Sequence, residues 1–189
     1  MRTRGQSAII ITCAGIWIFL MVGCTGSAIR LKSDRYLPLF SASEYGEYKG
    51  KQIYLYDIAH QAGNSKIFYY RSETGRDPYE SIPSPLDAYF WVCFKKAFEH
   101  AGLEVWEIAA PAGVPIIRIV FDSISDRKFT FEVTLKKEGE RLFQKVFLVA
   151  KSQPPFQDPV QLEQGAYRML DESVTAILKD SDFKKAFLK

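Results

Sequence analysis

The chain has 189 residues, of which 47% are hydrophobic and 25% are charged, a composition typical of one globular domain. This composition excludes a long disordered tail, a collagen-like repeat and a polytopic membrane protein. The formal net charge is +3, but Arg2 and Arg4 supply two of these charges ahead of the first apolar run. The remaining chain is nearly neutral and has no long-range attraction for polyanions, so we expect no nucleic-acid partner.

Residues 1–23 have the features of a bacterial secretion signal. Arg2 and Arg4 form a positively charged start, and an apolar run follows over residues 8–20 with no charge before Arg30. The run is short for a membrane-spanning helix, which needs about 20 apolar residues, and it ends at small residues. We therefore expect residues 1–23 to be a signal peptide.

The signal ends in Met21-Val22-Gly23-Cys24, which resembles the lipobox of bacterial lipoproteins. The resemblance implies cleavage before Cys24 and acylation of its thiol, and several acyl chains on one residue anchor a protein stably to a membrane. Thr25 stands where an aspartate commonly retains Gram-negative lipoproteins at the inner membrane. We expect a lipid anchor, most consistent with the outer membrane facing the periplasm; a plain signal-anchor helix with an incidental cysteine is the alternative.

The cysteine count fits this interpretation. The sequence has 3 cysteines, and Cys13 belongs to the expected signal while Cys24 is the expected lipidation site. Cys93 is then alone, which excludes an intrachain disulfide. Its position among apolar residues at helical spacing predicts a buried side chain rather than a catalytic thiol.

Beyond the signal, the pattern predicts a lipidated N-terminus and flexible tether over residues 24–51, rich in glycine, serine and proline, and a single domain over residues 52–189. The alternation and periodicity within that domain predict strands at 52–58, 66–71, 103–107, 116–124, 128–137 and 142–152, helices over 85–101 and 159–177, a loop over 72–84 and a last helical turn over 183–188. Residues 35–39, within the tether, could form a short edge strand.

The helix over 85–101 has the strongest local signals. Ser84 is a favourable N-cap, Pro85 suits the first helical position, and Phe90 and Phe94 repeat at helical spacing. The short connections between the strands of residues 116–152 predict an antiparallel meander. Together these elements predict an α+β two-layer sandwich, with a mainly antiparallel sheet and two main helices on one of its faces.

Catalytic and metal-binding patterns are absent from the sequence. It contains no glycine-rich phosphate loop and no Gly-x-Ser-x-Gly nucleophile turn, and neither of its two histidines, His60 and His100, has a second ligand at metal-binding spacing. We therefore expect no catalytic residue, no cofactor and no metal, and the chain is predicted not to be an enzyme.

Tyrosines are dense in the first two predicted strands, where Tyr54, Tyr56, Tyr69 and Tyr70 occur. A sheet with one covered face cannot bury both phases of a strand, so some of these rings should remain outside the core. Tyrosine is enriched at protein interfaces, and the four residues are candidates for a partner-binding surface. The alternative is that the rings pack beneath a loop.

The mature chain also resembles the auxiliary lipoproteins of ABC-type phospholipid transport systems that accompany mammalian-cell-entry (MCE) domain proteins. The resemblance rests on element order: Cys24, the early pair Tyr36-Leu37, a helix starting at Pro85-Leu86, and Phe121-Asp122 in a strand that enters the meander. It implies a non-catalytic accessory of a cell-envelope transport or assembly complex. A small-ligand or lipid-binding lipoprotein, or a hydrolase with its site in the 72–84 loop, are the alternatives.

Overall fold

The computed structural model describes residues 29–60, 67–72, 75–81, 86–124, 128–150 and 159–189. The expected lipidation site, Cys24, lies outside the described residues. The strands are β1 (Ile29–Leu31), β2 (Gln52–His60), β3 (Ile67–Ser72), β4 (Gly75–Ser81), β5 (Glu104–Trp106), β6 (Ile116–Ile124), β7 (Lys128–Lys137) and β8 (Glu140–Ala150). The helices are η1 (Ala42–Tyr48), a 3-10 helix, and α1 (Leu86–His100), α2 (Pro159–Lys179) and α3 (Ser181–Phe187).

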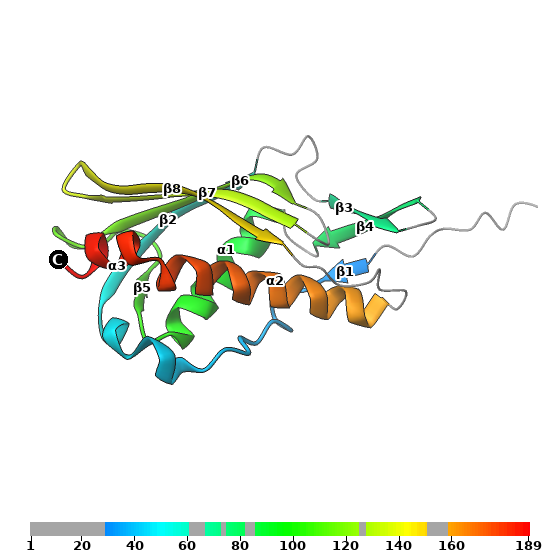
Figure 1. The fold of residues 1–189 in the computed structure, drawn as a ribbon, viewed down its shortest axis with the longest axis horizontal. Coiled ribbons are helices and arrows are strands. Elements are labelled where there is room, and N and C mark those ends of the chain that lie inside the picture. The colour runs from blue at the N-terminus through cyan, green and yellow to red at the C-terminus, as the bar shows by residue number, and fades with distance from the viewer. Residues whose placement is uncertain (1–28, 61–66, 73–74, 82–85, 125–127, 151–158) are drawn as a thin grey trace, which may run out of the picture.

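The described strands form two sheets. The larger has the order β5-β2-β6-β7-β8, with β2 parallel to both of its neighbours and β6, β7 and β8 joined as an antiparallel meander (Figure 1). The smaller has the order β1-β4-β3. Most paired residues in the two sheets lie in antiparallel ladders, and the expected meander is confirmed.

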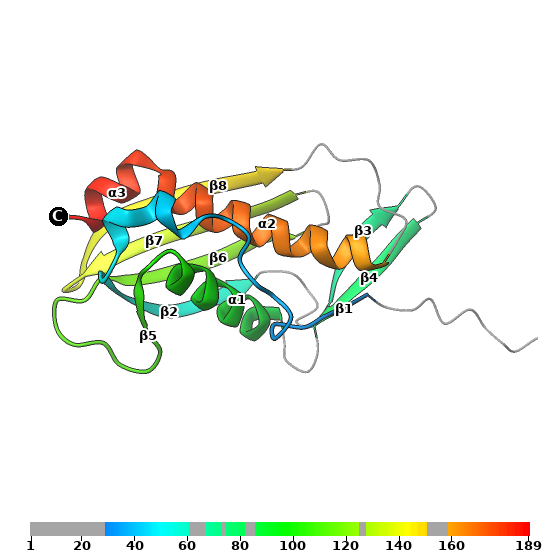
Figure 2. The same cartoon turned by 90° about the horizontal axis from the view of Figure 1, so that it is seen from below.

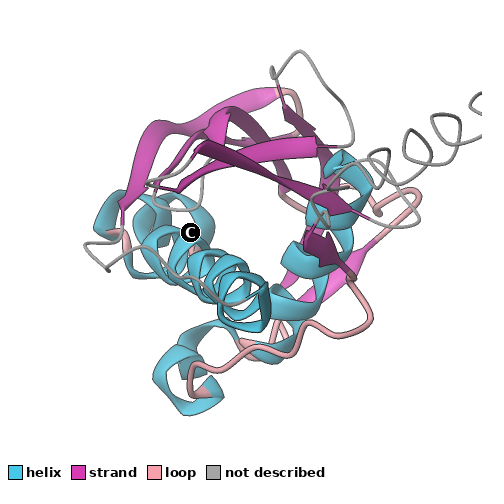
Figure 3. Cartoon of the chain, turned by 90° about the vertical axis from the view of Figure 1, so that its right-hand side faces the viewer, coloured by secondary structure: helices cyan, strands magenta, loops and turns pink. Residues whose placement is uncertain are grey.

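The helices lie on one face of the larger sheet. Helix α1 packs against β2, α2 packs against β7 and β8, and α3 packs against β8, as the views from below and from the end show (Figures 2 and 3). No helix in the described part of the chain covers the opposite face. The structure therefore confirms the expected α+β class, with helices layered on one side of the sheet.

The core between the two layers is built from phenylalanines. From α1, the ring of Phe90 stacks on that of Phe121 in β6 at 4.6 Å between centroids, and Phe94 meets the same ring edge-on at 6.1 Å. Phe129 and Phe131 of β7 extend the cluster. Strict alternation along β7 buries both of these rings, because successive side chains of a strand point to opposite faces.

Two short features of the sheets differ from the prediction. The segment expected as a loop, residues 72–84, contains β4, which pairs with β3 in register from Ser72↔Gly75 to Ile67↔Glu80. Pro78 suggested a break, but it lies just before the first residue that pairs with β1, where β4 has only one neighbour and a missing N–H is tolerated. Residues 35–39 are not a strand, and the edge strand β1 lies earlier.

The prediction of a flexible tether over residues 24–51 is wrong for residues 32–51, which pack against the rest of the domain. We call residues 32–51 the N-terminal belt. Three belt tyrosines are buried against α2, and the side chain of Lys96 in α1 donates to the carbonyl oxygen of Ser33 at 2.7 Å. In Figure 2 the belt crosses in front of α1 and α2. Glycine and serine suggested a flexible segment, but the buried aromatic side chains between them supply enough apolar contact to fix it.

The three tyrosines of the belt follow one face of α2. The hydroxyl of Tyr36 donates to Asp171 Oδ1 at 2.6 Å, that of Tyr48 donates to the carbonyl oxygen of Leu178 at 2.6 Å, and that of Tyr45 shares a hydrogen bond with Thr175 at 2.9 Å. Their partners on α2 are four and then three positions apart, so they lie on one stripe of the helix. The belt and α2 therefore run in the same direction, held at three points.

Asp171 is a buried carboxylate whose hydrogen-bond donors come from the belt. Burial raises the pKa of its carboxyl group, while hydrogen bonds from the Tyr36 hydroxyl and from the backbone N–H of Leu39, at 3.1 Å, act in the opposite direction. Burial and the neighbouring carboxylate raise the pKa of Tyr36 well above its usual value, so its hydroxyl remains a donor. The belt thus supplies the donors that an ionised side chain requires away from water.

Replacing Phe94 by alanine should lower the free energy of unfolding by about 3–5 kcal/mol, because the ring is fully buried and leaves a cavity. The matched change Ile108→Ala, at a side chain that is 88% exposed, should cost about 0.5 kcal/mol or less. Urea unfolding of both variants measures the difference. A loss below about 1 kcal/mol for Phe94→Ala would contradict the assigned core.

Tyr36→Phe should cost about 1–3 kcal/mol, because it leaves Asp171 with one donor fewer while the ring stays in place. Tyr45→Phe, which removes a neutral and partly buried hydrogen bond, should cost about 1 kcal/mol or less. Losing the donor raises the Asp171 pKa further, so the deficit of Tyr36→Phe should be largest at neutral pH and shrink as pH falls through that pKa. A deficit independent of pH would contradict an ionised Asp171.

Candidate functional site

The uncovered face of the larger sheet carries the first candidate site. Tyr54 and Tyr56 both project from it, with ring centroids 5.9 Å apart and the rings edge-to-face. The Tyr54 hydroxyl donates to the carbonyl oxygen of Ile108 at 2.7 Å, which fixes its orientation. Tyr56 is 60% exposed, and no hydrogen bond joins its hydroxyl to another described residue. Of the two rings, Tyr56 is the more available to a partner.

A bulge in β2 explains why Tyr56 projects so far. Leu55 pairs with Ile117 and Asp57 with Arg118, so Tyr56 is an extra residue between two consecutive pairs. Bulges of this kind redirect a side chain and are common beside functional sites. Alternation alone would not place both Tyr56 and Asp57 toward solvent.

A shallow groove of about 250 Å³ lies beside Tyr56. Its lining consists of Tyr56, Ile116, Arg118, Thr134 and Lys136. Arg118 pairs with Asp57 at 3.1 Å, whereas Lys136 forms no ion pair with a described residue. The groove thus combines an aromatic and an aliphatic side chain with a cation that has no ion-pair partner in the described part of the chain, a composition that suits an apolar side chain flanked by an acidic group.

Further apolar side chains continue this face of the sheet. Trp106, Tyr54 and Ile116 occupy one row across β5, β2 and β6, because they are register partners. At the other edge of the sheet, Val146 and Leu148 of β8 are exposed. We call this set, with Tyr56, the outer sheet surface.

The four tyrosines expected to form one surface do not lie in one sheet. Tyr54 and Tyr56 lie in β2 of the larger sheet, whereas Tyr69 and Tyr70 lie in β3 of the smaller one. The side chains of Tyr69 and Tyr70 are outside the described part of the structure. The two strands follow each other in the chain, but β2 pairs with β5 and β6 whereas β3 pairs with β4.

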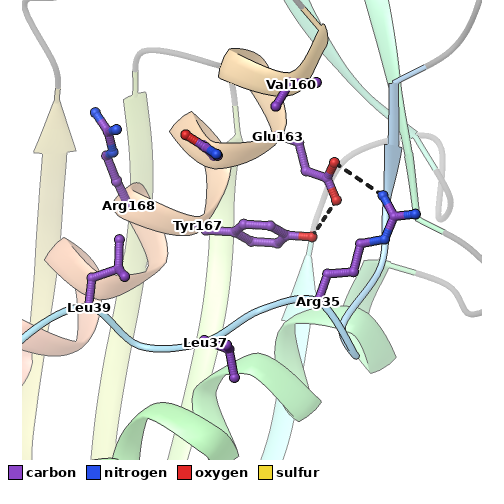
Figure 4. Close-up of a pocket in the computed structure, with 8 residues that line it drawn as sticks. Arg35, Leu37, Leu39, Val160, Glu163, Tyr167 and Arg168 are labelled. Atoms are coloured by element: carbon purple, nitrogen blue, oxygen red, sulfur yellow. Dashed lines mark hydrogen bonds and ion pairs between the residues drawn. The ribbon is translucent and has the colours of Figure 1, made fainter.

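A second concavity lies between the belt and the beginning of α2 (Figure 4). It measures about 340 Å³, and its lining consists of Arg35, Leu37, Leu39, Val160, Glu163, Gln164, Tyr167 and Arg168. The Tyr167 hydroxyl donates to Glu163 Oε1 at 2.7 Å, and Arg35 approaches the other oxygen of that carboxylate at 3.5 Å. Sequence reasoning missed this site; the available signal was the pair Leu37 and Leu39 beside Arg35.

The described residues offer little reactive chemistry. No group of three or more histidine, cysteine, aspartate or glutamate side chains that could hold a metal ion occurs among them. Cys93 is buried, as expected, and burial raises the pKa of its thiol to about 12, so it stays protonated and unreactive at neutral pH. His100 Nε2 donates to the belt, at 2.8 Å from the carbonyl oxygen of Phe40.

Within the described part of the chain, no helix is both long and apolar enough to cross a membrane. The longest, α2, is 21 residues, and its buried stripe faces the sheet.

Comparison with known proteins indicates similarity of fold alone. No family model matches the chain, and no curated protein matches it. The crystal structure of protein XCC0632 from Xanthomonas campestris, of the family model DUF330, is similar over 79% of this chain and 91% of that one, with a TM-score of 0.54 and 10% identity. Another solved structure, of an uncharacterized protein, covers 68% of this chain and 93% of its own, with a TM-score of 0.44 and 15% identity.

Proposed function

We propose that the protein is a lipoprotein anchored through Cys24, on the outer membrane facing the periplasm, and that it is a non-catalytic docking component of a cell-envelope transport or assembly complex. The observation that carries the docking role is the outer sheet surface, with Tyr56 at its centre. Aromatic and aliphatic side chains are exposed there on a sheet whose opposite face is covered by helices. An apolar surface of this kind on a folded domain marks an interaction site.

The shape and chemistry of the groove favour a protein partner. Interface energy concentrates in tyrosine, tryptophan and arginine side chains that fill or line pockets. Tyr56 and Arg118 line the groove, and Trp106 lies in one row with Ile116, which also lines it. Because the Tyr54 hydroxyl is already bonded to the carbonyl oxygen of Ile108, the Tyr54 ring has little side-chain freedom to lose when a partner binds.

The class of complex follows from the sequence resemblance and not from the fold. The order of elements after Cys24 is similar to that of the auxiliary lipoproteins of ABC-type phospholipid transport systems, and the fold similarity to XCC0632 is compatible with that order. A shared fold does not by itself assign a function. The proposed partner is therefore a component of such an envelope system, and the experiments below address anchorage and docking separately.

Anchorage is tested by Cys24→Ala. The variant should take up no radiolabelled palmitate and should accumulate as uncleaved precursor, because acylation needs the thiol at this position. The matched control is Cys93→Ala, whose buried thiol should be dispensable for labelling. Palmitate incorporation into the Cys24→Ala protein would contradict the lipobox interpretation.

Docking is tested by Tyr56→Ser in the full-length, membrane-anchored protein. Loss of a central interface tyrosine typically costs about 2 kcal/mol or more, which corresponds to roughly 30-fold weaker partner binding. The control is Ile108→Ser, an apolar position outside the groove that is 88% exposed, against 60% for Tyr56. Binding is measured by crosslinking in intact cells followed by purification from detergent-solubilised membranes.

Both variants should keep the melting temperature of the wild type, because neither side chain is buried. A folded Tyr56→Ser protein that recovers the same crosslinked components at wild-type yield would contradict docking through this surface.

A further inference from the structure

Three exposed aliphatic side chains surround the concavity between the belt and α2. Leu37 is 71% exposed, Leu39 72% and Val160 58%. They line the same concavity of about 340 Å³, and we call them the aliphatic patch. Exposed leucines are ordinary when scattered singly, but here three exposed aliphatic residues line one hollow.

The belt holds the two leucines of the patch in this exposed position. Just before Leu37, the side chain of Tyr36 is buried and bonded to Asp171, and the backbone N–H of Leu39 donates to the same carboxylate at 3.1 Å. The chain is therefore pinned on both sides of Pro38. Because the backbone is fixed, Leu37 and Leu39 cannot turn into the core, and their exposure belongs to the folded state.

Basic side chains border the patch. The Arg35 guanidinium contacts Glu163 at 3.5 Å but keeps more than half of its side chain exposed, and Arg168 is exposed with no ion pair to a residue in the described ranges. Figure 4 shows both arginines at the rim of the concavity, on opposite sides of Tyr167. Exposed aliphatic groups next to arginines match the two layers of a phospholipid surface, acyl chains beneath anionic headgroups.

The position of the patch along the chain also favours contact with a phospholipid surface. Ile29, the first described residue, lies five positions after Cys24, and five residues span at most about 18 Å when extended. Strand β1 and the beginning of α2, which carries Val160, lie at the same end of the molecule (Figures 1 and 2). An acylated Cys24 therefore places this end of the domain next to the bilayer.

We propose that the aliphatic patch is a membrane-contact surface that rests among the headgroups of the anionic bilayer to which Cys24 is anchored. The proposal rests on the proposed lipid anchor and extends it, because an anchor alone leaves the orientation of the domain free. Contact at Leu37, Leu39 and Val160 fixes that orientation. The outer sheet surface then lies away from the lipid and accessible to a protein.

The experiment places one environment-sensitive fluorophore on the acylated full-length protein through Leu39→Cys. Cys93 does not compete for the label, because it is buried and its thiol pKa is raised to about 12. The protein is reconstituted into vesicles of phosphatidylethanolamine and phosphatidylglycerol that carry a headgroup-linked quencher. Ile108→Cys, at an exposed position on the β5–β6 connection far from β1, is the matched control.

A label at Leu39 should be quenched roughly threefold or more compared with a label at Ile108, because interfacial contact brings apolar side chains about 5–10 Å into the headgroup region. Val160→Cys, on a different element, should give the same result as Leu39→Cys. Replacing phosphatidylglycerol by phosphatidylcholine should reduce the quenching at both positions, because the arginines lose their anionic partner.

Equal quenching at Leu39, Val160 and Ile108 in protein that floats with the vesicles would overturn the membrane-contact surface and leave the anchor intact. Protein that does not float with the vesicles would overturn the anchor and the contact surface together. Quenching at Leu39 that is unaffected by phosphatidylglycerol would contradict the role of the arginines and of the anionic headgroups.

Discussion

The buried carboxylate of Asp171 is the constraint on which the arrangement of this domain depends. A carboxylate removed from water is costly unless donors surround it, and here the donors come from the Tyr36 hydroxyl and the Leu39 backbone, more than 130 residues earlier in the chain. If the belt left α2, Asp171 would lose both donors at once. The N-terminal belt is thus part of the folded domain, although its composition resembles that of a linker.

This constraint fixes where the rest of the chain leaves the domain. Tyr45 and Tyr48 continue the contact along α2, and ion pairs from Glu44 to Lys179 and from Glu47 to Lys184 carry it to the last helix. The segment toward Cys24 therefore departs from one end of the molecule, beside β1. Under the proposed lipid anchor, this end of the domain would face the membrane, and the outer sheet surface would remain on another side.

Much of the fold could be predicted from local patterns. The bounds of β6 and β7 agree with the prediction to the residue, because strict alternation and short turns specify them. A last helical turn is also present as α3, where the side chain of Asp180 accepts from the backbone N–H groups of Asp182 and Phe183 at 3.0 Å each. The inner face of α1 was likewise readable from its periodicity. These signals depend only on residues close together in the sequence.

The features that were missed depend on contacts between distant residues. Nothing near Tyr36 in the sequence shows that its hydroxyl meets Asp171, so local composition predicts a tether where the structure has the belt. Pro78 likewise favours a loop in the local pattern, although β4 has no neighbour on one side there and tolerates it. The candidate site was found only in part. Alternation placed Tyr54 and Tyr56 outside the core, but the groove also needs Arg118 and Lys136 from neighbouring strands, and the aliphatic patch needs α2 beside the belt.

The central claim, that the belt is a fixed part of the domain, is tested most directly by hydrogen exchange of the Leu39 backbone N–H. This group donates to buried Asp171, so it should exchange as slowly as the core amides of α2, with an opening free energy close to that of global unfolding. Exchange of Leu39 at the rate of an unstructured peptide, while the amides of α2 stay protected, would contradict the account.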